Sequence, residues 1–293
     1  MSFILTSDDL GRTEKKENVV NGVSVHIPSG AVYAVTGNDR PGREVLLDML
    51  SGAVRPSRGT IRTSDDLKSI GVMTAEPALY PNLTALQNLN IKKTAFKEAE
   101  NQDMKELLHF TGLSQWEHVR VRSFSNLMRK RLGVALALVG DPGLIILQEL
   151  FTGADPLAAS DFGIMIRRLK EEGRTLLISG HPEENLLQHA DIFGIFESGT
   201  LREEISREEL MRRLRTHVVL SVDPLDKARE VLEAEGIFSY RTQEPNTVLL
   251  MERMDEADAL ADKLREAGAA VYAVRPAYDP LESYFASRKG GLR

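Results

Sequence analysis

Short apolar runs alternate with helical patterns along the first two thirds of the chain. Residues 31–35, 144–147 and 175–178 are almost wholly apolar, which is typical of strands buried on both faces. Residues 45–50 and 157–172 carry apolar side chains at helical spacing. Strands joined by helical crossovers form parallel sheets with helices on both faces. The pattern therefore predicts an α/β domain built on a parallel sheet.

A long insert, from about residue 83 to residue 140, separates the first and second of these strands. Its apolar positions recur at helical spacing, most clearly over residues 104–110 and 127–138. We expect this insert to form a helical subdomain.

A second, smaller domain is predicted beyond residue 215. Residues 206–215, rich in Arg and Glu, favour a solvated linking helix. The hydrophobic pattern after it follows the order β-α-β-β-α-β, the split pattern of a ferredoxin-like α+β module. The expected elements are strand 218–222, helix 225–234, strands 238–242 and 247–251, helix 257–267, strand 270–274 and a final helix at about 281–288. The chain is thus divided into residues 1–215 and 216–293.

Composition excludes several function classes. The 293 residues contain no Cys, which excludes a disulfide framework, a thiolate metal site and cysteine catalysis. The six His show no metal-ligand spacing, so we expect no metal site. The start of the chain has no basic region before an apolar stretch, and no apolar run approaches the ~20 residues that span a bilayer. We therefore expect that the chain is not secreted and that it has no membrane-spanning segment.

The charge balance argues against nucleic acid as a partner. The chain has 37 Lys and Arg against 43 Asp and Glu, a net charge of −6. A local basic cluster is present and fits a solvated helix face better than a nucleic-acid patch. Its members are Arg120, Arg122, Arg129, Lys130 and Arg131.

Residues 37–44 have the glycine spacing of a phosphate-binding loop, G-x-x-x-x-G-K-[ST], between a predicted strand and a predicted helix. The lysine of that motif is replaced by Arg43, and the hydroxyl residue that binds Mg²⁺ by Glu44. A carboxylate ~4 Å from phosphate costs about 4 kcal/mol at an effective dielectric near 20. Arg43 offsets part of this cost, or Glu44 occupies the anion site itself. The loop reads Gly37, Asn38, Asp39, Arg40, Pro41, Gly42, Arg43 and Glu44, and its proline lacks a backbone donor.

Four more segments follow this loop. They are residues 76–84 (EPALYPNLT), 124–133 (FSNLMRKRLG), 144–149 (LIILQE) and 178–181 (ISGH). In this order and spacing the chain resembles the ATP-binding subunit of ABC transporters, from about residue 5 to residue 214, and most closely the drug, bacteriocin and lantibiotic exporter branch. The resemblance implies a P-loop NTPase-like (ABC ATPase) core with a helical subdomain, and a C-terminal α/β extension.

The resemblance assigns roles to some residues that match the family. It implies that Glu149 is the general base, that His181 contacts the γ-phosphate, and that Asp155 lies in the loop that crosses the dimer interface, although Asp before Pro also starts turns. The signature Leu-Ser-Gly-Gly-Gln corresponds to residues 124–128, of which Ser125 alone matches.

Other residues depart from the family. Gln148 replaces the aspartate that orients Mg²⁺, and Ala75 replaces the Gln or Glu of the following loop. Leu10 falls where an aromatic residue stacks on adenine, and Leu127 replaces a signature glycine that lets backbone approach the γ-phosphate. We therefore expect that ATP binds weakly or not at all and that Mg²⁺ does not bind.

The partners follow from the resemblance. It implies an ABC permease and a homodimer or heterodimer with another nucleotide-binding domain, at the cytoplasmic face of the membrane. Glu76, Leu79 and Tyr80 are expected at the groove that receives the permease, with ordinary packing as the alternative.

Three hypotheses for the function remain open at this point. The first is a non-hydrolysing docking and dimerisation subunit of an ABC exporter. The second is an active ATPase with non-standard chemistry at Arg43 and Glu149. The third is a soluble scaffold or regulator outside transport.

Overall fold

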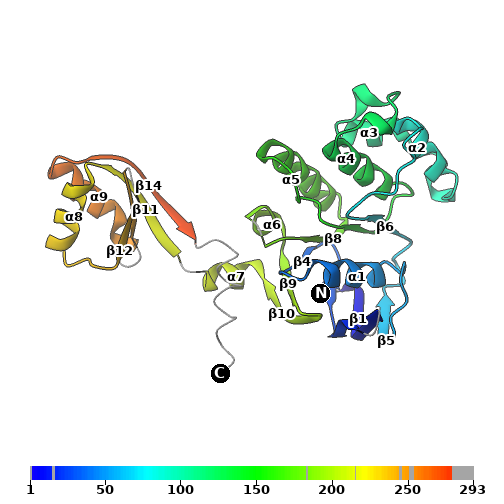
Figure 1. The fold of residues 1–293 in the computed structure, drawn as a ribbon, viewed down its shortest axis with the longest axis horizontal. Helices are drawn as coiled ribbons and strands as arrows, with labels where there is room; N and C mark the ends of the chain where they lie inside the picture. Colours follow the sequence, from blue (N-terminus) through cyan, green and yellow to red (C-terminus); the bar gives the residue numbers. More distant parts are fainter. Residues whose placement is uncertain are drawn as a thin grey trace. The chain divides into compact units, whose positions relative to one another are not determined.

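The computed structural model describes residues 2–14, 17–182, 184–214, 216–243, 246–250 and 254–278. It divides into two compact units, Met1–Glu209 and Leu210–Arg293 (Figure 1). Arg215, where the sequence places a domain boundary, and the predicted helix at 281–288 lie outside the described residues. Each unit is a separate body with its own hydrophobic core.

A six-stranded sheet forms the centre of the first unit. Its strand order is β10-β9-β4-β8-β7-β6, parallel except for β10 at one edge. The strands are β4 (Val32–Thr36), β6 (Ile70–Met73), β7 (Leu144–Leu147), β8 (Thr175–Gly180), β9 (Ile192–Glu197) and β10 (Thr200–Ser206). Every residue of β4, β7 and β8 is buried, as their continuous apolar sequences require. The predicted α/β fold class is confirmed.

Helices cover both faces of this sheet. On one face, α1 (Arg40–Leu50) shares a buried core with side chains of β4, β7 and β8. On the other face lie α5 (Pro156–Glu171) and α6 (Glu184–His189), as Figure 1 shows. The helix α7 (Arg207–Arg213) crosses the division between the two units.

A second, antiparallel sheet in this unit was not predicted. It contains β1 (Phe3–Glu14), β2 (Glu17–Val23), β3 (His26–Pro28) and β5 (Arg58–Thr63), with β1 paired to the other three. Register shifts interrupt β1, so its buried residues do not alternate regularly with exposed ones. This irregularity hides the strand from a search for period-two patterns.

The helical subdomain contains α2 (Ala85–Lys93), α3 (Met104–Phe110) and α4 (Asn126–Ala137). The short turns Lys97–Ala99, Ser114–Trp116 and Val121–Ser123 connect them. Thr84 begins α2 with a capping box, in which its hydroxyl and the side chain of Gln87 each accept a hydrogen bond from the other residue's backbone. The three helices lie together in Figure 1 around their own apolar core.

The second unit has the strand order β12-β13-β11-β14, with α8 (Leu225–Ala234) and α9 (Ala257–Glu266) packed on the sheet. Its strands are β11 (Thr216–Asp223), β12 (Tyr240–Gln243), β13 (Thr247–Leu250) and β14 (Ala270–Tyr278). The sequence of elements is the β-α-β-β-α-β order of a ferredoxin-like fold.

Candidate functional site

The polar residues singled out in the sequence gather at the carboxyl ends of the parallel strands. Thr36 at the end of β4 is in register with Gly180 at the end of β8, and Leu147 at the end of β7 with Ile178. The loops that follow β4, β6, β7 and β8 therefore emerge at one edge of the sheet, where ligands bind in open α/β folds.

The two glycines of the loop after β4 are required by packing. Gly37 has a φ of +136°, and a Cβ atom there would lie 1.9 Å from the carbonyl oxygen of Phe196. A Cβ on Gly42 would lie 2.5 Å from the ring of Phe196. Close contact with β9 thus explains the glycine spacing without any bound phosphate.

The start of α1 is capped by a carboxylate of the loop itself. Asp39 Oδ1 accepts a hydrogen bond from Gly42 N at 3.0 Å, and Asp39 Oδ2 accepts one from Gly199 N at 2.8 Å. The sequence suggested Glu44 as the internal anion, but Glu44 Oε1 instead accepts from Arg40 Nε at 2.8 Å. Asp39 occupies this position because it lies at the N-cap, three residues before the amide that it binds.

Arg43 is buried against the residue that the sequence assigns as general base. Its Nη2 donates to Glu149 Oε1 at 2.7 Å, and its Nη1 donates to the carbonyl oxygen of Gly37. The side chains of Arg43 and Glu149 are only 1% and 4% exposed. Thr152 Oγ1 donates to the other oxygen of Glu149 at 2.7 Å. Each charge of this pair is therefore satisfied by a partner within the chain.

The electrostatic surroundings keep Glu149 ionised. Burial alone would raise the pKa of Glu149, but hydrogen bonds from Arg43 and Thr152 and the positive charges of Arg43 and Arg40 lower it below its ordinary value. A carboxylate held in this way is a weak proton acceptor, because a general base works best when its pKa lies near the working pH.

Gln148 and Ala75 stand where the family has an Asp and a Gln or Glu, and a hydrogen bond joins them. The amide oxygen of Gln148 accepts from Ala75 N at 3.2 Å, and its Nε2 donates to Asp48 Oδ1 at 2.7 Å. This neutral amide joins α1, β7 and the loop after β6. No group of three or more His, Cys, Asp or Glu side chains in the described part of the chain is placed to hold a metal ion.

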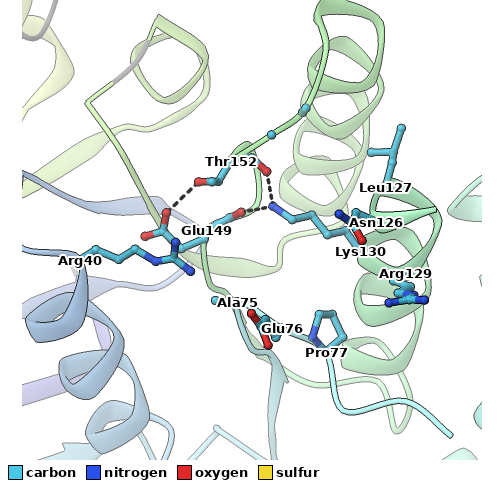
Figure 2. A pocket seen from close by; sticks show the side chains of 12 residues that line it. Arg40, Ala75, Glu76, Pro77, Asn126, Leu127, Arg129, Lys130, Glu149 and Thr152 are labelled. Atoms are coloured by element: carbon cyan, nitrogen blue, oxygen red, sulfur yellow. Dashed lines mark hydrogen bonds between the residues drawn. The ribbon is translucent and has the colours of Figure 1, made fainter. Parts of the chain in front are cut away.

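The turn after Glu149 is held by a lysine from the helical subdomain. Lys130 Nζ on α4 donates to the carbonyl oxygens of Glu149 at 2.5 Å, Thr152 at 2.6 Å and Leu150 at 3.3 Å. Figure 2 shows two of these bonds from one ammonium group. Lys130 was expected on a solvated helix face, so this contact between subdomains is a correction.

Its neighbour Arg131 also donates hydrogen bonds to residues outside α4. It donates to the carbonyl oxygen of Thr111 at 3.0 Å and to the carboxylate of Asp161 on α5. Only Arg120, Arg122 and Arg129 of the basic cluster are exposed.

A cavity of about 470 Å³ lies beside these contacts (Figure 2). Its walls come from α1, the loop after β6, the turn after β7 and the start of α4. They are formed by Arg40, Ala75, Glu76, Pro77, Asn126, Leu127, Arg129, Lys130, Glu149, Thr152, Gly153 and Ala154.

Ser125 and Asp155 act as helix caps in this structure. Ser125 Oγ accepts from Met128 N at 3.2 Å at the start of α4, and Asp155 Oδ1 accepts from Ala158 N at 2.8 Å at the start of α5. His181 is exposed directly after β8, Asn38 is exposed in the loop after β4, and Pro41 is exposed in the first turn of α1.

A second cavity, of about 690 Å³, lies between the core and the helical subdomain. Tyr80, 56% exposed, lines this groove. Leu79 instead packs against the core of the helical subdomain, and Glu76 lines the smaller cavity. The groove is lined by Asp48, Ser51, Gly52, Ala53, Val72, Met73, Thr74, Pro77, Ala78, Tyr80, Asn88, Ile91, Lys92, Ala95, Gly133 and Leu136.

Comparison with known proteins identifies the family. The sequence profile described as "ABC transporter" matches residues 20–152. The chain is 31% identical over 296 residues to the uncharacterized ABC transporter ATP-binding protein YcbN of Bacillus subtilis, covering 97% of this chain and 96% of that protein. The chain belongs to the ABC transporter ATP-binding proteins.

Two relatives of this ABC family have named transport roles. The bacitracin transport ATP-binding protein BcrA of Bacillus licheniformis is 28% identical, with 99% of each chain covered. The lantibiotic transport ATP-binding protein SrtF of Streptococcus pyogenes is 31% identical, over 74% of this chain and 98% of its own length. A solved ATP-binding subunit of an ABC transporter shares the fold, with a TM-score of 0.63 at 23% identity over 72% of this chain and 92% of that one. No helix in the described ranges has the length and apolar character to cross a bilayer.

Proposed function

We propose that this ABC protein is a non-hydrolysing subunit of an exporter, docked to a permease at the cytoplasmic face of the membrane. The observation that carries the proposal is the buried pair of Arg43 and Glu149. The residue at the phosphate-binding position and the residue at the general-base position are bound to each other, while Asp39 takes the amide at the start of α1.

The energy needed to open this pair supports the proposal. A phosphate could reach Arg43 only after the guanidinium had left Glu149, whose side chain is 4% exposed. Removing one partner of a buried ion pair costs about 3–5 kcal/mol. At 1.4 kcal/mol for each factor of ten, that cost weakens ATP binding by roughly two to three and a half orders of magnitude. The neutral Gln148 gives Mg²⁺ no charge to recover this loss.

The relatives support a role in the transport of peptide antibiotics. These relatives are named for bacitracin transport and lantibiotic transport, and 99% of the length of BcrA is matched. We infer a substrate of this class, a permease that spans the membrane, and a second nucleotide-binding domain, either another copy of this chain or a homologue with an intact phosphate loop.

Steady-state hydrolysis of Mg·ATP by the purified full-length chain tests the proposal. The expected rate equals that of Glu149→Gln, which lacks the candidate base. Turnover that Glu149→Gln abolishes would instead establish the active-ATPase alternative. The triple variant Arg43→Lys, Glu44→Ser, Gln148→Asp is a matched control, because it removes the pair and restores the lysine, hydroxyl and carboxylate of the motif. It is expected to bind Mg·ATP more tightly than the natural chain does.

Association with the membrane tests the docking part. The proposal predicts that the chain co-purifies with an integral membrane permease. Its complete recovery without such a partner would favour the scaffold hypothesis.

A further inference from the structure

A further cavity, of about 410 Å³, lies at the amino ends of β7 and β8, at the opposite edge of the sheet from the candidate site. Asp141 and Pro142, just before β7, line it together with Arg174, which directly precedes β8. Its other walls come from α3, the end of α4 and the second half of α5. Small-molecule sites commonly enclose ~300–1,000 Å³. The cavity therefore has the size of a ligand site and shares no lining residue with the two cavities described above.

The floor of this cavity is apolar. Leu138, Ile145 and Leu169 line it and are 8%, 0% and 3% exposed, and Pro142 beside them is also buried. Leu107 of α3 adds a half-buried side chain. An apolar ligand side chain placed on this floor would be withdrawn from water, which favours its binding.

Some polar groups at the rim already have partners within the chain. The carboxylate of Asp141 accepts a hydrogen bond from the guanidinium of Arg174. Gln102 Nε2 donates to Leu138 O at 3.0 Å, and Gln102 Oε1 accepts from Gly140 N at 3.0 Å. These groups fix the shape of the cavity and leave no unmet charge for a ligand.

Three other charged side chains at the rim, those of Arg168, Glu106 and Glu172, have no such partner. In the part of the chain that the structure describes, none of them lies within 4.0 Å of an opposite charge. The guanidinium of Arg168 lies over the ring of Phe110, 5.3 Å from the centroid, although Glu172 is four residues further along. A guanidinium stacked on a ring keeps its N–H donors in its own plane, where a carboxylate can accept two of them.

We propose that this cavity binds an apolar amino acid or short apolar peptide as its zwitterion. The ligand carboxylate accepts from Arg168, its ammonium lies near Glu106 and Glu172, and its apolar side chain covers the floor. The rim offers one free cation and two free anions, so it favours a ligand with both charges over a simple anion. Such a ligand joins α3 of the helical subdomain to α5 of the core. The inference is independent of the proposed function.

Isothermal calorimetry on the full-length chain without nucleotide tests this proposal. The dipeptide Leu-Phe, with both ends free, is compared with its N-acetyl form and its C-terminal amide, each of which lacks one charge. We expect each modified form to bind about fivefold more weakly, since the rim charges are exposed. Gly-Gly keeps both charges but has no apolar side chain, and should give no saturable heat up to about 5 mM. Free phenylalanine distinguishes the two ligand sources, because tighter binding than Leu-Phe identifies a single amino acid.

Variants of neighbouring residues assign the preference to the rim. Arg168→Gln should remove the advantage of the free carboxylate, so that Leu-Phe and its amide bind within about twofold of each other. The matched control Arg167→Gln removes the same charge from an exposed position outside the cavity and should keep the advantage. Glu172→Gln should reduce the advantage of the free ammonium, whereas the exposed Glu171→Gln should not.

Three results would overturn the proposal. If neither Leu-Phe nor phenylalanine gives saturable heat up to about 5 mM, the cavity is not a site for this class of ligand. If the acetylated and amidated forms bind as tightly as Leu-Phe, the rim does not select a zwitterion. If Arg167→Gln weakens binding as much as Arg168→Gln, the ligand binds elsewhere. Each result is obtained without ATP, so failure here is distinct from failure of the non-hydrolysing assignment.

Discussion

Replacing Arg43 by Met tests whether the buried pair stabilises the first unit. The substitution keeps an unbranched side chain that reaches about as far as Nε but removes the charged end of the guanidinium, so Glu149 is left with 4% exposure and without its cation. Gly37 also loses a donor to its carbonyl oxygen. Breaking a buried pair from one side costs about 3–5 kcal/mol, and we expect a loss in that range in the free energy of unfolding.

Urea unfolding measures this loss. The fluorescence of Trp116, the single tryptophan of the chain, reports on the helical subdomain of the first unit. Arg40→Met is the matched control in the same loop. Its ion pair with Glu44 has side chains 52% and 33% exposed, and such a surface pair contributes about 0–1 kcal/mol.

A double-mutant cycle separates the pair from its surroundings. Arg43→Met combined with Glu149→Gln removes both charges, so the double variant should lose about 2–3 kcal/mol less than the sum of the two single losses. The reasoning is refuted if Arg43→Met costs no more than Arg40→Met, or if the two single losses simply add.

Three further predictions concern the same region. Lys130→Met removes three hydrogen bonds to the turn after Glu149 and should speed amide hydrogen exchange over residues 149–155. The control Arg129→Met changes an exposed side chain and should leave this exchange unchanged, so equal exchange in both variants would contradict the role of Lys130. The pKa of Glu149 is lowered in the folded state, so the ionised carboxylate contributes its full stabilisation above the ordinary pKa of 4.5 and loses it as the pH falls through the lowered pKa. In acid, the urea midpoint of the natural chain should therefore fall more steeply with pH than the midpoint of Glu149→Gln. Gly37→Ala should lower the melting temperature even without nucleotide, because its Cβ would lie 1.9 Å from a backbone oxygen; an unchanged melting temperature would show that this contact is not required.

The parts of the fold that the sequence predicts are those whose burial leaves a simple pattern. The runs at β4, β7 and β8 are apolar at nearly every position because both faces of the sheet are covered. In the second unit, α8 has the predicted bounds because its apolar face repeats with the helical period. The long strand β1 escapes prediction because register shifts break its alternation.

The chemistry of the site was only partly visible in the sequence. The sequence indicates that Arg43, Glu44 and Gln148 depart from a phosphate-binding motif, but a motif does not state which partners the new side chains take. The ion pair of Arg43 with Glu149 joins residues 106 positions apart, so it depends on tertiary structure. Asp39 was recognisable, since an Asp two residues before Pro at the start of a helical pattern is an N-cap signal.

The role of Lys130 carried no such signal. It lies in a run of basic residues whose periodicity does not indicate which of them reaches another subdomain. The length of its side chain allows contact with three carbonyl oxygens that converge at the turn after β7. Such convergence appears only when the turn and α4 are placed in space.

Equilibrium titration of the full-length chain with Mg·ATP by isothermal calorimetry tests the central claim most directly. If Asp39, Arg43 and Glu149 remain bound to partners within the chain, no saturable heat is expected up to about 1 mM nucleotide. The variant with Lys, Ser and Asp at positions 43, 44 and 148 should give measurable heat under the same conditions. Saturable binding of Mg·ATP to the natural chain in the micromolar range would contradict the account.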